Sequence, residues 1–353
     1  MNLVELLRRH AELTPQHVAL LDYSSGRARP LTYAALEAAA QRAATLLVQN
    51  GLQPGDVVLV FHPMSADLYI ALNAILRLGL AAMFIDPSMG KAHIERCCAL
   101  MAPKAMLASP KAQWLWLISP ALRRIRIRFV TGLGLPGTVR WQKWTQCPPH
   151  PQIVACRAET PALITFTSGS TGLPKVAVRT HGFLQQQHRV LEKTLQLRAT
   201  DLVLTTWLIF VLTHLASGTS TLIPAGDLRH PGRVKPEPIM AALTQHAVTC
   251  LEASPAFLAR VVQYGQDQAQ AFPRLRQIFT GGAPVLPNLL AATQSLAPNA
   301  TVNAVYGSTE AEPIAHITYA EMSDHDKKSM VNGGGLLTGA PIADINMAIL
   351  PDS

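Results

Sequence analysis

Apolar runs alternate with amphipathic stretches through the first third of the chain. Residues 57–61, Val-Val-Leu-Val-Phe, indicate a buried strand, and the next strand is expected at 81–85. Between them, Ser65 is a suitable N-cap for a helix that fills the interval. Thr32 can cap an earlier helix, whose apolar residues recur at helical spacing as far as Asn50.

The alternation continues to the end of the chain, and Ser254 followed by Pro255 supplies an N-cap and a first helical residue. Helix following strand repeatedly predicts an α/β fold, with largely parallel sheets covered by helices on both faces. Further strands are expected at 105–108, 162–166, 202–206, 219–223, 248–252, 275–280 and 301–305, and further helices at 91–100, 182–195, from Pro236, from Pro255 and at 286–296.

Residues 202–224 are nearly uncharged and are long enough to suggest a transmembrane helix. Threonines, His214, Gly218 and Pro224 interrupt this stretch, so a buried strand, a helix and a second strand explain it better. Residues 114–151 are less regular and rich in proline, which predicts a turn-rich connector and a subdomain boundary near residue 150.

Composition supports a folded protein, because 49% of the 353 residues are hydrophobic and only 15% are charged. The net charge of +8 suits anionic partners such as ATP, phosphopantetheine carriers, a membrane surface or nucleic acid, without selecting one. The dense basic run at 123–128, Arg-Arg-Ile-Arg-Ile-Arg, predicts a strand with a solvated arginine face. Nucleic-acid binding is disfavoured, because interleaved aromatic residues and a known motif are lacking.

The chain has five cysteines, and their spacing contains no C-x-x-C pair. We therefore expect neither a zinc site nor a disulfide framework. Together with an N-terminal sequence that lacks the layout of a signal peptide, this predicts a cytoplasmic protein that contacts a membrane peripherally if at all.

Residues 167–175, Thr-Ser-Gly-Ser-Thr-Gly-Leu-Pro-Lys, have the composition of an anion-binding loop. Gly169 and Gly172 allow sharp turns that bring backbone N–H groups close to a ligand, and Lys175 adds a mobile positive charge. Hydroxyls that can donate to phosphate come from Thr167, Ser168, Ser170 and Thr171. A surface linker is the plain alternative, but the strand before the loop and Pro-Lys after it disfavour that interpretation. The spacing is not that of a Walker loop.

The loop resembles the phosphate-binding signature of the acyl-adenylate-forming superfamily, which includes acyl-CoA synthetases, peptide synthetase adenylation domains and firefly luciferase. Thr180-His181 also fits the family pattern, whereas Val176 stands where the family usually has glycine. Trp207 to Phe210 occupies the place of a segment that lines the family's acyl pocket, and plain core packing is compatible with that role. The resemblance implies substrate contacts for His181, Trp207 and Phe210.

Two more motifs follow in the family's order. The resemblance implies that Gly281-Gly282-Ala283-Pro284 packs under adenine. In Tyr306-Gly307-Ser308-Thr309-Glu310, it implies a tyrosine ring stacked on adenine, a glycine that lets the backbone approach, a threonine hydroxyl on phosphate and a glutamate that holds Mg²⁺. Lys175, Thr309 and Glu310 are the expected catalytic residues, with ATP and Mg²⁺ required and CoA or a phosphopantetheine carrier as acceptor.

The implied fold is the superfamily's large N-terminal domain: two stacked αβα subdomains with mostly parallel sheets, and a third, barrel-like subdomain that is truncated. The corresponding ranges are 1–150, 151–335 with the phosphate loop 167–175, and 336–353 as the first barrel strand. Residues 85–90 with His93 and Cys97, and residues 311–315, resemble the branch of long-chain fatty acyl-CoA ligases and olefin β-lactone synthetases.

The family's ribose-binding Thr-Gly-Asp motif, its hinge and its C-terminal domain with a catalytic lysine are not found in this sequence. The expected function is therefore ATP-dependent activation of a carboxylic acid, expected to be a fatty acid, to an acyl-adenylate. Nucleotide binding is expected to be weak and turnover slow unless a C-terminal half is supplied. A non-catalytic nucleotide- or acyl-binding protein and an ATP-dependent β-lactone synthetase are the alternatives, and an acyl carrier protein is a further expected partner.

Overall fold

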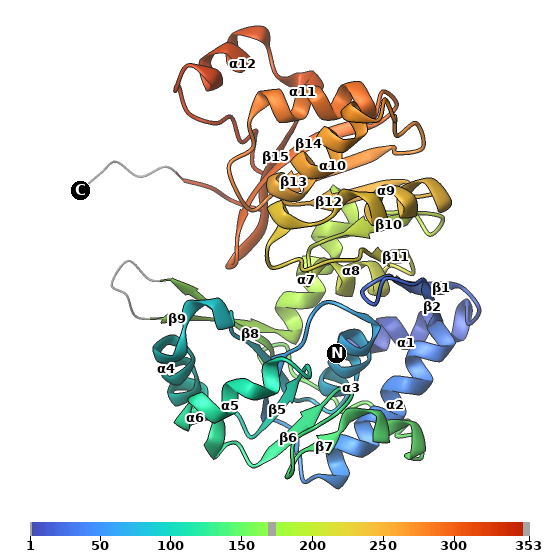
Figure 1. The fold of residues 1–353 in the computed structure, drawn as a ribbon, viewed down its shortest axis with the longest axis vertical. Helices are drawn as coiled ribbons and strands as arrows, with labels where there is room; N and C mark the ends of the chain where they lie inside the picture. Colours follow the sequence, from blue (N-terminus) through green and yellow to red (C-terminus); the bar gives the residue numbers. More distant parts are fainter. Residues whose placement is uncertain (1, 169–173, 349–353) are drawn as a thin grey trace. The chain divides into compact units, whose positions relative to one another are not determined.

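Two sheets organise the chain, each in its own unit of the computed structural model, which describes residues 2–168 and 174–348. The first unit comprises residues 1–18 and 31–186, and the second comprises 19–30 and 187–353. Each sheet is mostly parallel, and helices connect most of its strands (Figure 1). The predicted α/β class is confirmed.

The sheet of the first unit has the order β7-β6-β5-β3-β4-β8-β9, in which only the β8–β9 pair is antiparallel among the described pairings. Its strands are β3 (Val57–Phe61), β4 (Ala81–Phe84), β5 (Ala105–Ala108), β6 (Ile127–Val130), β7 (Val139–Arg140), β8 (Pro161–Ser168) and β9 (Pro174–Thr180). Its helices are α1 (Val4–Leu13), α2 (Tyr33–Gln49), α3 (Ala66–Arg77), α4 (Lys91–Met101), α5 (Leu115–Ile118) and α6 (Pro120–Arg124), with 3₁₀ turns η1 (Pro87–Met89), η2 (Ala112–Trp114) and η3 (Trp141–Gln146).

Local sequence signals explain where two of these helices begin. The Thr32 hydroxyl accepts a hydrogen bond from the backbone N–H of Ala35, and Ser65 accepts one from Leu68, so both predicted N-caps are confirmed. Each cap satisfies a backbone donor that the first turn leaves unpaired.

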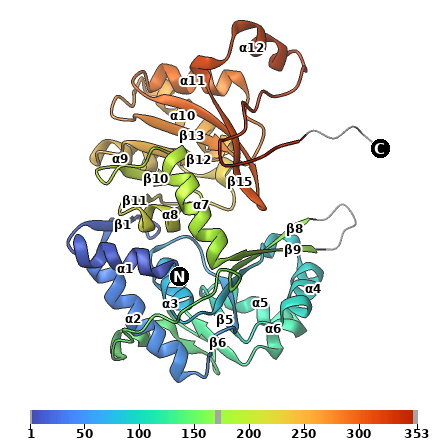
Figure 2. The ribbon, with the colours of Figure 1, turned by 180° about the vertical axis from the view of Figure 1, so that it is seen from behind.

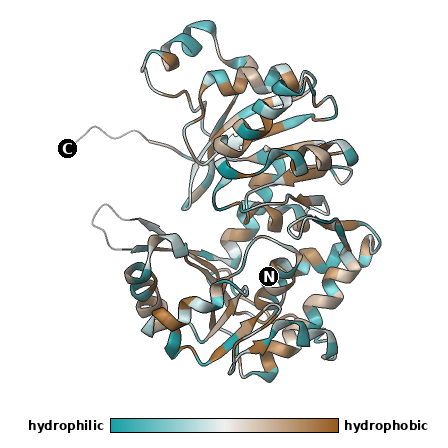
Figure 3. Cartoon of the chain, viewed as in Figure 1, coloured by the Kyte–Doolittle hydropathy of each residue, from teal (hydrophilic) through white to brown (hydrophobic). Residues whose placement is uncertain are grey.

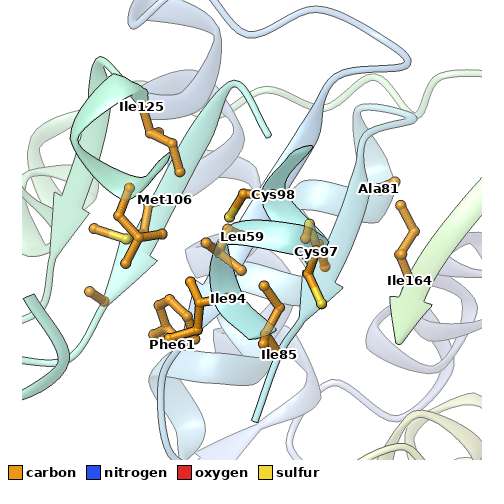
Figure 4. Packing of buried hydrophobic residues seen from close by; sticks show 13 residues of the cluster. Leu59, Phe61, Ala81, Ile85, Ile94, Cys97, Cys98, Met106, Ile125 and Ile164 are labelled. Carbon is orange, nitrogen blue, oxygen red and sulfur yellow. The ribbon is translucent and has the colours of Figure 1, made fainter. Parts of the chain in front are cut away.

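One face of the first sheet packs against helices α4 and α6 through a hydrophobic cluster. Leu59, Met106 and Ile94 pack there with Cys97 and Cys98, which are consecutive residues of α4 (Figure 4). Burial of these side chains is the main favourable contribution to the stability of this layer.

The sheet of the second unit has the order β15-β14-β13-β12-β10-β11-β1-β2. Its strands are β1 (Val18–Asp22), β2 (Arg29–Thr32), β10 (Leu202–Thr205), β11 (Ser220–Ile223), β12 (Cys250–Ala253), β13 (Gln277–Gly281), β14 (Thr301–Ser308) and β15 (Ala311–Thr318). Its helices are α8 (Phe210–Ala216), α9 (Pro236–Gln245), α10 (Pro255–Asp267), α11 (Pro287–Leu296) and α12 (Asp324–Val331), with turns η4 (Pro231–Arg233) and η5 (Tyr319–Glu321); α7 (His181–Thr194) begins in the first unit and ends in the second.

Strands β1, β11, β10, β12, β13 and β14 pair in parallel, so their carboxyl ends share one edge of the sheet. The segment at 202–224 folds as strand, helix and strand, as predicted. In the described part of the chain, no helix combines the length and the apolar character needed to cross a bilayer.

The structure corrects several boundaries. Strands β8 and β9 belong to the first sheet and β1 to the second, so the chain does not divide near residue 150 but near 186, with 19–30 joining the second unit. Strand pairing between distant segments decides this division, and local composition does not report it. Residues 114–151 are more regular than predicted, because they contain α5, α6, β6, β7 and η3.

Two smaller predictions need correction. Ser254 and Pro255 occupy the predicted N-cap and first helical positions of α10, but the Ser254 hydroxyl makes no capping hydrogen bond. The barrel strand expected at 336–353 is not formed by residues 336–348, which contribute only an isolated bridge between Ala315 and Pro341. No closed barrel is present among the described residues.

Candidate functional site

The first motif is carried by the hairpin of β8 and β9. Strand β8 pairs in parallel with β4, and β9 returns antiparallel beside it, with Thr167 opposite Lys175 and Ser168 opposite Pro174 (Figure 2). The connection therefore leaves the carboxyl end of a parallel strand, which is where open α/β sheets bind ligands. The predicted position of the loop after a buried strand is confirmed.

Only the flanks of this loop are described. Gly169, Ser170, Thr171 and Gly172 lie outside the described residues, so their predicted roles stay predictions. Lys175 is exposed, and none of the described acidic groups forms an ion pair with it. Its charge is thus accessible to an anion, which is what a phosphate-binding lysine requires.

His181 follows β9 directly as the first residue of α7, and it is fully buried. Its Nδ1 accepts a hydrogen bond from the backbone N–H of Leu3 at 3.4 Å, while Nε2 has no partner in the described part of the chain. Burial lowers the pKa of His181 to about 4, so the imidazole is neutral at pH 7. The hydrogen bond from Leu3 thus gives His181 a structural role. Its contact with substrate stays a prediction.

The second motif is carried by the hairpin of β14 and β15. The sequence predicts that the strand ends at Val305, but β14 continues to Ser308, because Tyr306 pairs with Ala315 and Ser308 with Ala311. Thr309 and Glu310 form the connection. Glu310 is exposed, and the ring of Tyr306 is 48% exposed, so both can meet a ligand.

The turn predicted to support adenine lies on the neighbouring strand. Gly281 ends β13 opposite Val305, and a Cβ atom at this position would lie 2.4 Å from the backbone oxygen of Val305. Glycine is therefore required by the close approach of β14. Gly282 adopts a φ of +78°, and Ala283 and Pro284 are exposed beyond the strand. Gly281–Pro284 and Tyr306 thus come from adjacent strand ends at one edge.

Trp207 follows β10 at the same edge, and Phe210 begins α8. Their rings meet at 4.8 Å between centroids in an edge-to-face arrangement. Phe210 is 4% exposed and packs with Phe279, whereas Trp207 and Val305 are partly buried against that cluster. The structure therefore shows the core packing that the sequence allowed as an alternative. Within this aromatic cluster, Trp207 is only partly buried and keeps some exposed surface.

Sequence reasoning missed a polar network inside the second unit. The imidazole of His214 on α8 lies 3.0 Å from the Thr221 hydroxyl through Nδ1 and 3.1 Å from the Glu252 carboxylate through Nε2. All three side chains are fully buried, and Glu252 lies beside Phe279 in the register of β12 and β13. A glutamate inside the apolar strand Cys250–Ala253 is the signal that could have revealed it.

Metal and thiol chemistry find little support in the described residues. No group of three or more His, Cys, Asp or Glu side chains there could enclose a metal ion. One carboxylate, such as that of Glu310, fits Mg²⁺ that is held mainly by phosphate oxygens and water. The five cysteines are free and buried. Burial raises the pKa of Cys97 to about 11 and those of Cys98 and Cys250 to about 12, so these thiols are protonated and poor nucleophiles at pH 7.

The predicted residues thus fall into two groups, each described within its own unit. The first unit holds Thr167, Ser168, Lys175 and His181. The second unit brings together Trp207, Phe210, Gly281, Gly282, Ala283, Pro284, Tyr306, Gly307, Ser308, Thr309 and Glu310, all at or just beyond the carboxyl ends of β10, β13 and β14. The first group offers the Lys175 cation and the Thr167 hydroxyl, and the second offers an aromatic ring, small residues and a carboxylate.

Comparison with known proteins gives a consistent result. The family described as "AMP-binding enzyme" matches residues 7–353. Olefin β-lactone synthetases from Xanthomonas campestris pv. campestris and Stenotrophomonas maltophilia are 28% and 27% identical, each over 91% of this chain. The chain spans 57% and 58% of the length of these two relatives.

Solved structures show the same fold. MbtA from Mycobacterium smegmatis is 25% identical, with a TM-score of 0.74 over 87% of this chain and 56% of that protein. The luciferase-like enzyme of the nonluminescent mealworm Zophobas morio has a TM-score of 0.79 at 19% identity, over 97% of this chain and 79% of that protein.

Proposed function

Because the chain belongs to the family of AMP-binding enzymes, we propose that it activates a carboxylic acid with ATP to form an acyl-adenylate. In this reaction a carboxylate oxygen attacks the α-phosphorus of ATP, the bond to the bridging oxygen breaks, and pyrophosphate leaves. The observation that carries the proposal is the β8–β9 hairpin, where an exposed lysine stands opposite Thr167 at the carboxyl end of a parallel strand.

The residues of the first unit bind the phosphates of ATP in this proposal. Thr167 and Ser168, with Gly169, Ser170, Thr171 and Gly172 between the strands, donate hydrogen bonds to the β- and γ-phosphates, and Lys175 contributes positive charge. Displacement at phosphorus depends on orientation and on neutralising charge rather than on a protein nucleophile, so donors and a cation are the groups it needs.

The residues of the second unit bind the nucleoside and the metal. Gly281–Pro284 and the half-exposed ring of Tyr306 hold adenine between adjacent strand ends, with Gly307 and Ser308 continuing that surface. Thr309 contacts the α-phosphate, and Glu310 is the protein ligand of Mg²⁺. When bound, Mg²⁺ supplies charge neutralisation at the phosphate oxygens.

An apolar acid is the proposed substrate. Trp207 keeps part of its ring exposed beside buried Phe210 and Phe279, which favours a hydrocarbon chain over a charged one. The resemblance of residues 85–90 and 311–315 to the branch that includes fatty acyl-CoA ligases favours a fatty acid. His181, as a further substrate contact, would have to act from a buried position. CoA or the phosphopantetheine arm of an acyl carrier protein is the proposed acceptor of the acyl group.

The test compares MgATP binding by the chain with that of Glu310→Ala, using calorimetric titration with and without Mg²⁺. Glu237→Ala, which also removes an exposed carboxylate from the second unit, is the matched control. We expect Glu310→Ala to lose the Mg²⁺-dependent part of the affinity, while Glu237→Ala keeps it. Equal heats for all three proteins would contradict the assignment of Glu310.

Formation of a β-lactone is the second candidate, favoured by the same two relatives. In that reaction the β-hydroxyl of a β-hydroxy acyl-adenylate attacks its own carbonyl carbon, the hydroxyl proton is released, and AMP leaves. The test measures release of AMP from two acids, with and without CoA. A β-lactone synthetase should release AMP from a β-hydroxy acid without CoA. An acid without the hydroxyl should release AMP only when CoA is present.

A non-catalytic role in binding nucleotide or acyl groups makes the opposite prediction. Exchange of labelled pyrophosphate into ATP that depends on a fatty acid would exclude it. We expect this exchange to be slow for the 353 residues alone and faster when a separately expressed C-terminal half of a relative is added. Full-rate exchange by the 353 residues alone would contradict that expectation.

A further inference from the structure

The first unit carries a surface on which exposed apolar and basic side chains adjoin. We call it the α5–α6 surface and define it by Trp114, Leu117, Ile118, Arg123, Arg124 and Arg126, all of which are exposed. We propose that this surface binds anionic lipid bilayers peripherally. The proposal is independent of the proposed adenylation chemistry.

The apolar half of the surface lies on one helical face. Trp114 ends η2 in a helical conformation and leads directly into α5, so that Trp114, Leu117 and Ile118 stand at positions i, i+3 and i+4. These side chains are 54%, 51% and 58% exposed, respectively. Three large apolar side chains on one solvent-facing helical turn indicate a surface that meets an apolar partner.

The rest of the segment is tied down, so the exposure is a property of the fold. The buried side chain of Gln113 donates to the Leu133 oxygen at 3.1 Å and accepts from the Leu135 N–H at 2.9 Å. The ring of Trp116 packs against the core of the first unit, with the Arg128 guanidinium 4.0 Å from its centroid.

The basic half follows from the packing of α6. Leu122 and Ile125 are buried in the core, which turns Arg123, Arg124 and Arg126 outward. The arginine run 123–128 thus spans the end of α6, a two-residue link and the first two residues of β6, so only its last part forms the predicted strand. Figure 3 shows this polar stretch beside the hydrophobic residues of α5.

The charges of these arginines are available to an outside partner. None of the three forms an ion pair with an acidic group in the ranges that the structure describes. Glu95 lines a groove together with Arg124, and its carboxylate lies 4.0 Å from the ammonium group of Lys91. Positive charge therefore dominates this face.

An anionic bilayer fits this combination better than other partners. Tryptophan prefers the interface of a bilayer, leucine and isoleucine enter its acyl boundary, and arginines attract acidic headgroups. Leu117 and Ile118 give a nucleic acid nothing to stack on or hydrogen-bond with. Self-association through a twofold axis would bring the same three arginines of two copies together, which like-charge repulsion opposes.

The experiment is sedimentation of the full 353-residue chain with phosphatidylcholine vesicles, with and without phosphatidylglycerol. We expect binding only with phosphatidylglycerol, weakening as salt is raised, together with a blue shift of the Trp114 emission that Trp114→Phe removes without abolishing binding. In Arg123→Gln/Arg124→Gln/Arg126→Gln, the partition coefficient should fall about fivefold per arginine, or roughly a hundredfold in total. In Leu117→Ser/Ile118→Ser it should fall about tenfold.

Two controls match these changes at exposed positions elsewhere. Arg9→Gln/Arg27→Gln/Arg157→Gln removes the same charge, and Leu13→Ser/Val331→Ser removes comparable apolar surface. Retained binding by both controls supports the proposal. Equal losses in a control and its test variant would overturn it, because net charge or general hydrophobicity would then suffice. Retention of duplex DNA or RNA that depends on the same arginines, without vesicle binding, would also overturn it.

Discussion

The hairpins β8–β9 and β14–β15 have the same strand arrangement, but their glycine-containing motifs lie at different places in it. Each leaves the carboxyl end of a strand that pairs in parallel within its own sheet and returns as an antiparallel strand. In the first hairpin, residues 169–173 lie between the paired Ser168 and Pro174. In the second, only Thr309 and Glu310 lie between the paired Ser308 and Ala311.

This difference changes what glycine does. In the first motif, both glycines fall in the connection between the strands. In the second motif, Gly307 is part of β14 at an irregularity of the ladder, where a Cβ atom would lie 3.2 Å from the oxygen of Ala311. In the second motif, glycine thus allows two paired strands to approach closely.

The hairpins also present opposite charges. Lys175 is exposed on β9, and Glu310 is exposed at the turn after β14. A cation suits phosphate and a carboxylate suits Mg²⁺. Under the proposed function, substitutions in the first hairpin should affect phosphate binding, and those in the second should affect adenine and Mg²⁺ binding.

The largest expected effect concerns the support of the second hairpin. In Gly281→Ala, the new methyl group would meet the Val305 oxygen at 2.4 Å, a backbone atom that cannot move without disturbing β14. We expect the free energy of unfolding to fall by about 3 kcal/mol in urea denaturation. Gly232→Ala, whose Cβ would lie 3.8 Å from its nearest neighbour, is the control. Similar losses in the two variants would show that the close approach is unimportant.

His181, which directly follows the first hairpin, should make the stability of the protein depend on pH. The pKa of His181 is about 4 in the folded protein and about 6.5 in the unfolded chain, so the unfolded state binds the proton more readily. The free energy of unfolding should fall by about 3 kcal/mol as the pH is lowered from about 6.5 to about 4.

Substitution separates this contribution from that of other groups. His181→Asn should lack this component of the pH dependence, whereas His325→Gln, at an exposed position, should retain it in thermal and urea denaturation. An unchanged slope in His181→Asn would contradict the assignment.

Removal of the positive charge of the first hairpin should weaken every ligand that carries phosphates. We expect Lys175→Met to raise the Kd for both ATP and pyrophosphate about thirtyfold, which corresponds to about 2 kcal/mol for a charge-assisted hydrogen bond. Lys235→Met, at another exposed position, should leave both affinities unchanged. An effect on ATP alone would assign Lys175 to the nucleoside instead.

The smallest effect should be confined to adenine. Tyr306→Leu should raise the Kd for ATP about fivefold, since an aromatic stacking contact contributes about 1 kcal/mol. Pyrophosphate binding should not change, and Tyr264→Leu should change neither affinity. If Tyr306→Leu weakened the binding of ATP and pyrophosphate equally, the proposal that the second hairpin binds adenine and the first binds phosphates would be contradicted.

Local patterns in the sequence determined much of this protein. Apolar runs gave the parallel strands, Thr32 and Ser65 began their helices, and the motif residues predicted strand ends as the place of ligand binding. These features depend on neighbours a few positions apart, so the sequence reports them directly.

Only the tertiary structure decided which distant segments pair. It placed β8 and β9 in the first sheet and β1 in the second, and it extended β14 through Tyr306 because β15 lies beside it. It also joined His214 to Glu252 and exposed Trp114, Leu117 and Ile118 on one face. Strand pairing and burial depend on contacts between residues far apart in the chain. A local sequence pattern does not specify which distant segment makes these contacts.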